Sequence, residues 1–215
     1  MRRRGGAVLS PSSTADRMIR CDEGQREWGM KRVYLAGPEV FLPNALEVGR
    51  AKVALAKEAG FEGLFPLDQN LDLDALPKIE QARRISLANE ALMRSADLLI
   101  ANLTPFRGVS MDAGTAFEVG FMRALGRPVF GYTNVAGDYR SRAEAFRRRG
   151  IPPGDSDAPG FEIEDFGMAE NLMIAVAILE SGGSVIEGRA PAGSEMADLA
   201  AYRRCLEEAR RLCLD

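Results

Sequence analysis

Apolar and polar residues alternate along residues 31–135 in two distinct patterns. Short apolar runs with polar, Gly or Pro residues at their ends indicate buried strands, at residues 32–36, 61–65, 97–103 and 127–132. Between them, apolar residues recur every three or four positions, which indicates amphipathic helices over residues 44–59 and 78–95 and another after residue 112. This alternation of strand and helix predicts successive βαβ units and therefore a parallel sheet.

The expected architecture is an α/β fold, a doubly wound, flavodoxin-like parallel sheet of about five strands with helices on both faces. Ligands of such sheets bind at the carboxyl ends of the strands. The strand ends and the loops after them are therefore the expected place for a site. We expect them to bring six residues to one edge: Tyr34, Gly37, Asp68, Asn102, Asp112 and Glu118.

The flanking segments follow neither pattern clearly. Residues 1–30 mix basic, Gly and Ser-Pro stretches, and we expect a mostly disordered extension before one domain over residues 31–183. Within that domain, residues 133–160 are rich in Gly, Pro and Arg, which predicts a loop excursion around a short helix at 140–149. Residues 184–215 are expected to form a C-terminal tail that ends in a docked amphipathic helix.

Two helices carry residues that need a partner. Residues 170–179 predict a helix that is apolar on nearly every face, so it lies either in the core or in a subunit interface. Asn89 lies near the apolar side of the helix predicted at 78–95. A buried amide must be hydrogen-bonded, so Asn89 is either a packing group or a ligand contact.

The charge balance and the cysteines exclude several classes of partner and site. The chain has 215 residues, 28 basic and 31 acidic, for a net charge of -3, which indicates neither nucleic acid nor an anionic membrane as a partner. No apolar run reaches the roughly 20 residues of a membrane span, and no signal peptide is apparent. Three widely spaced cysteines predict neither a disulfide framework nor a zinc site. We expect a cytoplasmic protein.

The chain contains no histidine. Catalysis by a serine-histidine triad, by a histidine base or at a histidine-ligated metal is therefore excluded, and carboxylates are the main candidates. The chain also lacks the Gly-x-Gly-x-x-Gly and P-loop motifs that bind dinucleotides and nucleotides. We expect a small ligand and neither a metal nor another cofactor.

The candidate carboxylates lie between residues 107 and 126. Asp112 and Glu118 are six residues apart, so on one helix they would point about 120° apart. We therefore expect Asp112 in the loop or cap before the helix, over the crevice that Glu118 reaches from the helix. The helix dipole would favour ionised Glu118, and Gly114 and Gly120 leave room for a substrate, which suits a nucleophile that attacks a sugar carbon. Alternatively, Asp112 is only a helix cap and Glu118 only a surface glutamate. The spacing of the two acids does not distinguish this alternative from a catalytic pair.

Several short motifs together resemble the nucleoside 2-deoxyribosyltransferase family. They are Tyr34-Leu-Ala-Gly-Pro-Glu-Val-Phe41, Pro66-Leu-Asp68, Ala96-Asp-Leu-Leu-Ile-Ala-Asn-Leu103, Arg107-Gly108, Asp112-x-Gly-Thr-x-x-Glu-x-Gly120 and Asn171-Leu-Met173. The similarity runs from about Arg32 to Ile178. Its most specific part is the element Asp-x-Gly-x-x-x-Glu-x-Gly.

The resemblance implies a glycosyltransferase of the pentosyl-transferring kind, which cleaves the N-glycosidic bond of a 2'-deoxynucleoside. Glu118 would be the nucleophile that forms a deoxyribosyl ester, Asp112 would bind and protonate the base, and Tyr34 would position the nucleophile. A second free nucleobase would then take the sugar. The resemblance also implies a set of substrate-binding residues: Gly37, Phe41, Asp68, Asn89, Gly114, Asn171 and Met173.

The family pattern further implies shared sites, and this chain departs from it in places. Asn171 would reach the 5'-hydroxyl of a sugar in a neighbouring subunit, which implies a homo-oligomer, a dimer or higher. Asn89 replaces a second base-binding aspartate, so proton delivery depends more on Asp112 or on another group. Short family members also lack the extension before Met30, the excursion at 135–160 and the tail.

Two alternative functions follow from these departures. One is an N-glycosidase that hydrolyses a nucleoside or a nucleoside 5'-monophosphate, in which Arg140, Arg142 and Arg147 could meet the phosphate. These arginines are more simply a solvated face, and the glycine- and arginine-rich phosphate motif of phosphoribohydrolases is absent. The other is a nucleotide-binding module without turnover, in which Glu118 would contact a ribose hydroxyl.

Overall fold

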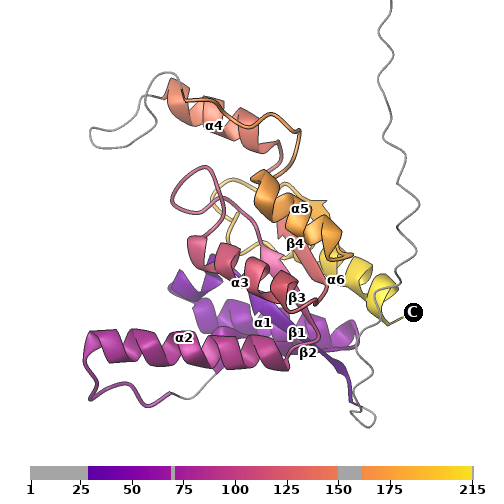
Figure 1. Cartoon of the computed structure of the whole chain (residues 1–215). Coiled ribbons are helices and arrows are strands. Elements are labelled where there is room, and N and C mark those ends of the chain that lie inside the picture. Colours follow the sequence, from indigo (N-terminus) through magenta and orange to yellow (C-terminus); the bar gives the residue numbers. More distant parts are fainter. Residues whose placement is uncertain (1–28, 69–70, 150–160, 215) are drawn as a thin grey trace, which may run out of the picture.

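A parallel five-stranded sheet forms the centre of the protein (Figure 1). The computed structural model describes residues 29–68, 71–149 and 161–214, so nearly all of the predicted N-terminal extension lies outside the described residues. The strands are β1 (Lys31–Ala36), β2 (Phe61–Leu64), β3 (Leu98–Asn102), β4 (Val129–Thr133) and β5 (Val185–Glu187). They run in the order β2-β1-β3-β4-β5 and every neighbouring pair is parallel. The predicted flavodoxin-like fold is confirmed.

The helices follow the apolar periodicity of the sequence. They are α1 (Ala45–Glu58), α2 (Lys78–Ser95), α3 (Ala113–Ala124), α4 (Tyr139–Arg148), α5 (Leu172–Glu180) and α6 (Ala200–Cys213), with short 3-10 turns η1 (Pro38–Phe41) and η2 (Pro66–Asp68). The first helix stops before Gly60, which has a φ of 94° in the left-handed region, as a glycine after a helix permits. Four strands also lie within two residues of their predicted runs.

The helices cover the two faces of the sheet as two layers. Alternate residues of a strand point to opposite faces, so along β1 Val33 and Leu35 pack with α1 and α6, whereas Tyr34 and Ala36 pack with α2, α3 and α5. In Figure 1, α4 stands apart from this body at the end of its own loop. The alternation along β1 places the Tyr34 side chain on the α3 side.

The segment from residue 184 onward is built into the sheet and the core. β5 pairs with β4 at the sheet edge, and α6 buries Tyr202, Cys205 and Leu206 against the α1 side. We expected only a tail with a docked helix there. β5 was not located from the sequence because it has three residues and is only partly buried, so no apolar run marks it.

Among the described residues, no helix has both the length and the apolar character that a bilayer span requires. In the same part of the chain, no three His, Cys, Asp or Glu side chains are grouped as a metal site would need.

Candidate active site

Tyr34 and Glu118 meet on the face of the sheet that α3 covers. Tyr34 is fully buried in β1, and its hydroxyl donates a hydrogen bond of 2.6 Å to Glu118 Oε1. α3 is held against the strands by the buried side chains of Val119 and Met122. Both members of the pair therefore stand on regular elements, which hold side chains more precisely than loops do.

Burial is the largest influence on Glu118 and raises its pKa to about 7. The hydrogen bond from Tyr34 lowers the pKa. The negative charges of Asp112 and Glu39 raise it, and the positive charge of Lys52 lowers it. The expectation that the helix dipole keeps Glu118 ionised is wrong, because Glu118 is the sixth residue of α3 and the dipole effect fades beyond the first turn. Near neutral pH both forms of Glu118 are populated.

The same contact fixes the protonation of the tyrosine. Burial, and then the charge of Glu118, raise the pKa of Tyr34 far above its ordinary value. Tyr34 therefore remains a hydroxyl donor at every physiological pH. Its bond occupies Oε1 of the carboxylate, and within the described part of the chain no hydrogen bond reaches Oε2.

Asp112 is the N-cap of α3, as predicted. Its Oδ2 accepts hydrogen bonds from the Thr115 backbone N at 2.9 Å and from Thr115 Oγ1 at 3.1 Å. Among the described residues, Oδ1 takes no hydrogen bond. A Cβ on Gly114 would come within 3.0 Å of Oδ2, so the glycine leaves space for the carboxylate. The negative charge of Asp112 raises the pKa of Glu118, so the cap of α3 and the helix residue influence each other electrostatically.

A second buried carboxylate, Glu39, follows β1 and is paired with Lys52. Lys52 Nζ lies 2.8 Å from Glu39 Oε1, which also accepts from Asn102 Nδ2 at 3.0 Å and from the Tyr132 hydroxyl at 2.8 Å. Glu39 Oε2 is buried without a hydrogen-bond partner in the described part of the chain, and a Cβ on Gly37 would come within 1.9 Å of it. Gly37 is therefore required. The cluster ties together the ends of β1, β3 and β4, as the prediction of Gly37 and Asn102 at one edge implied.

Neither Glu39 nor Lys52 was singled out from the sequence as a candidate site residue. Lys52 is fully buried and its ammonium also lies 5.1 Å from the centre of the Tyr202 ring. A signal was present, because Lys52 is four residues from both Val48 and Ala56, which are buried on the apolar stripe of α1. A charge on that stripe needs a buried partner.

Comparisons with known proteins show which family the chain belongs to. The profile of the nucleoside 2-deoxyribosyltransferase family matches residues 33–173. The chain belongs to this family. It is 33% identical over 167 residues to an uncharacterized protein of Schizosaccharomyces pombe, covering 71% of this chain and 79% of that one.

Solved structures similar to this family member include a 2-desoxiribosyltransferase from Leishmania mexicana. It is 31% identical, with a TM-score of 0.50, and the match covers 67% of this chain and 85% of that one. A conserved protein from Enterococcus faecalis is 21% identical, with a TM-score of 0.52, covering 85% of this chain and 99% of that one, and shows a shared fold. Members of the family act on nucleosides and nucleobases, so this protein is an enzyme of the glycosyl-transferring kind.

Two residues expected from the family pattern lie apart from the Tyr34 and Glu118 pair. Asn171 is the N-cap of α5; its Oδ1 accepts from the Met173 backbone N at 3.0 Å, and its Nδ2 donates to Glu164 at 2.6 Å. Met173 is 71% exposed on the surface of α5. No described contact joins either residue to Tyr34, Asp112 or Glu118.

Phe41, one of the substrate-binding residues that the family resemblance implied, lies in an aromatic stack. It is 55% exposed and stacks on Phe106, with ring centres 5.4 Å apart and planes 11° apart. The Arg107 guanidinium lies over both rings, 5.1 Å from Phe41 and 4.6 Å from Phe106, from a residue with a φ of 56° in the left-handed region. The sequence did not indicate this stack. It offers a flat, partly exposed aromatic surface at the loop that follows β3.

The structure gives fewer details for the two remaining predicted residues, Asn89 and Asp68. Asn89 is partly buried in the second half of α2. Asp68 ends η2, but its side chain lies outside the described part of the structure.

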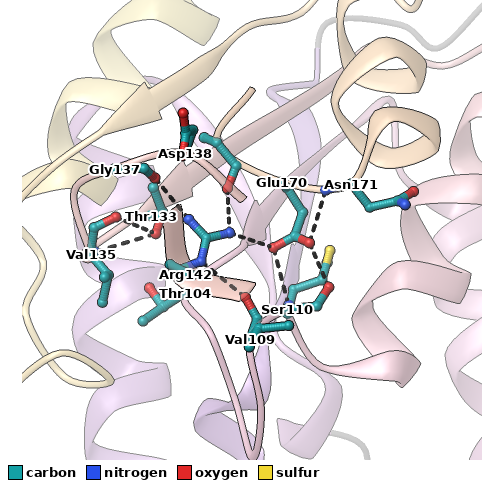
Figure 2. Close-up of polar contacts among 12 residues, drawn as sticks. Thr104, Val109, Ser110, Thr133, Val135, Gly137, Asp138, Arg142, Glu170 and Asn171 are labelled. Carbon is teal, nitrogen blue, oxygen red and sulfur yellow. Dashed lines mark hydrogen bonds and ion pairs between the residues drawn. The ribbon is translucent and has the colours of Figure 1, made fainter. Parts of the chain in front are cut away.

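The three arginines considered for a phosphate are engaged with the protein itself. Arg140 bonds Glu144 at 2.7 Å and also Asp165. Arg147 donates to the Phe161 carbonyl at 3.0 Å. Arg142 donates to three backbone carbonyls and approaches the buried Glu170 (Figure 2). Arg142 therefore neither lies on a solvated face nor is free to contact a phosphate, the two roles considered from the sequence.

Proposed function

We propose that this protein is a nucleoside 2-deoxyribosyltransferase whose nucleophile is Glu118. The observation that carries the proposal is the 2.6 Å hydrogen bond from Tyr34 to Glu118 Oε1, with Asp112 close enough to influence the glutamate. A carboxylate oriented through one oxygen has the other free for attack. This arrangement matches a retaining glycosyl transfer, in which a carboxylate forms a covalent intermediate.

In the first half of the reaction, Glu118 Oε2 forms a bond to C1' of the sugar while the bond from C1' to the base nitrogen breaks. The bonding pair goes to the base, and Asp112 delivers the proton that neutralises it. In the second half, a new base attacks C1', the ester bond to Glu118 breaks, and Asp112 takes a proton back. Atoms and charges balance without a cofactor.

The other assigned residues have supporting roles in this proposal. Tyr34 holds the nucleophile, and the exposed ring of Phe41 offers a stacking surface for the base. Gly114 keeps the space beside Asp112 open, and Gly37 keeps the space beside Glu39 open. Asn89 and Asp68 remain candidates for contacts to the substrate.

We further propose a homo-oligomer in which Asn171 and Met173 serve the site of a neighbouring subunit. Supporting this, the outer side of α5 and α3 exposes large apolar side chains, including Met173, Val176, Leu179 and Phe117. Exposed apolar groups gathered on one layer mark an interface more often than a free surface. Light scattering with size-exclusion chromatography measures the oligomer; a monomer at working concentration would contradict this part.

The reaction is tested by incubating the protein with a 2'-deoxynucleoside and a second free base. We expect the exchanged nucleoside, and a protein mass increased by one deoxyribosyl group when the first base is removed. Glu118→Ala should abolish both, whereas Glu62→Ala, which removes an exposed glutamate, should leave both unchanged. Release of free base without exchange would instead support a hydrolase, and binding without either product would support a module without turnover.

A further inference from the structure

Glu170 is a buried carboxylate that the proposed reaction does not use. Its side chain is 0% exposed, and both oxygens accept hydrogen bonds. Oε1 accepts from Ser110 Oγ at 2.5 Å and from the Asn171 backbone N at 3.0 Å. Oε2 accepts from the Met111 backbone N at 3.2 Å and from Arg142 Nη2 at 3.4 Å. Four donors from three segments of the chain therefore converge on one carboxylate.

Arg142 extends the same network to the backbone. Its Nε donates to the Val109 carbonyl at 2.9 Å, Nη1 to the Gly137 carbonyl at 2.8 Å, and Nη2 to the Ala169 carbonyl at 2.6 Å. Figure 2 shows the guanidinium at the centre of these contacts, between the loop of Val109 and Ser110 and the segment that enters α5. Because the planar guanidinium has donors in fixed directions, one side chain sets the relative position of three segments.

These contacts hold the three residues that precede Asp112. Val109, Ser110 and Met111 are each bound by Arg142 or Glu170, and Asp112 follows directly as the cap of α3. The helix fixes Asp112 from one side through Thr115, and the network fixes the chain on the other side. The contacts of Asp112 with Thr115 fix it only to its own helix. The contacts of Arg142 and Glu170 fix the position of the loop that leads to it.

We propose that Arg142 and Glu170 are positioning residues for Asp112, holding the loop at 109–111 so that the Asp112 carboxylate meets the nucleobase. This inference rests on the proposed function. The two residues touch no reacting atom; they act through the backbone that carries the proton donor. Displacement of such a donor by about 1 Å is enough to slow a reaction about a hundredfold.

Glu170→Gln tests the inference with almost no change in volume. Whichever way the amide is turned, its NH₂ group faces a backbone N–H, either that of Asn171 or that of Met111, so at least one contact is lost. Glu144→Gln is the matched control, because it removes an exposed glutamate that pairs with Arg140 on α4. Circular dichroism confirms that each variant is folded before its activity is measured.

The deciding measurement compares two substrates that differ in their need for a proton. 2'-Deoxyguanosine requires protonation of the leaving base, whereas its N7-methylated cation loses a neutral base without it. Deoxyuridine and its 5-fluoro derivative form a milder pyrimidine pair, because the fluorinated base leaves more readily as an anion. We measure kcat as release of the first base in a single turnover, which excludes the second half of the reaction. We expect Glu170→Gln to lower this kcat at least about tenfold with the first substrate of the pair and at most about threefold with the activated one, and Asp112→Asn should do the same. Glu144→Gln should change neither.

Arg142→Lys should reproduce the pattern of Glu170→Gln, because an ammonium cannot keep all three carbonyl contacts. Hydrogen exchange of the Met111 amide should be faster in both variants and unchanged in Glu144→Gln. An equal loss of activity with both substrates of a pair, or an unchanged kcat with both, overturns the inference while leaving the proposed function intact. A wild-type protein that neither exchanges nor cleaves any of these nucleosides refutes the proposed function and this inference together.

Discussion

Glu118 is partly buried and Glu170 is fully buried, and their hydrogen-bond surroundings are opposite. Among the described residues, Glu118 accepts one hydrogen bond, from Tyr34, and burial raises its pKa to about 7. Glu170 accepts four donors, one of them a guanidinium. A carboxylate with all its lone pairs satisfied is held in one role, whereas one with an open oxygen retains the capacity to react. The number of donors among the described residues therefore separates the proposed nucleophile from a carboxylate that is held in place.

The largest expected effect is on activity at the open carboxylate. Glu118→Gln keeps the shape of the side chain and removes the proposed nucleophile, so the proposed transfer should fall by more than about 10³-fold. The free energy of unfolding should not fall at pH 8, because the mutation removes a partly desolvated charge that the fold disfavours. Initial rates and urea titration at pH 8 measure the two quantities. A clear loss of stability without a loss of activity would reverse the roles of the two glutamates.

The next effect concerns a third carboxylate, Glu39, whose partner is a buried lysine. Lys52→Met keeps the length of the stem and leaves the charge of Glu39 without its ion pair. Removing one member of a buried pair costs about 3–5 kcal/mol of unfolding free energy. Urea titration measures the loss, with Lys57→Met, an exposed lysine on the same helix, as the control. The double variant Lys52→Met with Glu39→Gln should recover part of the loss; no recovery would show that the ion pair is not the cause.

A smaller loss of stability is expected at the satisfied carboxylate. Glu170→Gln should lower the unfolding free energy by about 2 kcal/mol, because hydrogen bonds to a buried charged group are lost and a donor is left facing a donor. Glu144→Gln, on the exposed surface, should change it by less than about 0.5 kcal/mol. Thermal and urea unfolding both report the difference. Equal effects of the two substitutions would mean that the four contacts of Glu170 contribute nothing beyond a surface pair.

The sequence predicted the elements that depend on local pattern and missed contacts between distant residues. β1, β3 and α3 were located because apolar runs and helical spacing are written in consecutive residues, and the cap at Asp112 followed from the spacing to Glu118. Arg142 and Glu170 are 28 residues apart, so nothing local shows that they meet.

Glu118 shows the same limit at a single residue. Its position in the chain was predicted, but its protonation was not, because the burial that raises its pKa comes from the packing of α3 on β1. The helix dipole, which is visible from sequence, acts mainly within the first turn of a helix. Burial by tertiary packing therefore raises the pKa of Glu118, whereas its position on the helix alone predicted a lowered pKa.

The smallest expected effect, and the most specific, is the pH dependence of Glu118. The proposed nucleophile must be ionised, so kcat/KM for an activated nucleoside that does not itself titrate near neutral pH should rise with pH with a midpoint at about 7. Tyr34→Phe should move this midpoint upward, because the hydrogen bond from Tyr34 lowers the pKa of Glu118. Asp112→Asn should move it downward, because the charge of Asp112 raises that pKa. A wild-type midpoint near the ordinary glutamate value of about 4.3 would show that Glu118 is not held in the buried state described.

The titration of Glu118 also makes the free energy of unfolding depend on pH. The folded pKa of Glu118 is raised above its unfolded value, so its contribution to the unfolding free energy is fully present below about pH 4 and is lost as pH rises through about 7. The difference in unfolding free energy between wild type and Glu118→Gln isolates this contribution from every other group that titrates. That difference should shift against the wild type between pH 5 and pH 8, with most of the change between about pH 5 and pH 7 and little change above about pH 7. A difference that is flat across the window would mean that Glu118 has the same proton affinity folded and unfolded, and the contrast with Glu170 would then rest on hydrogen bonds alone.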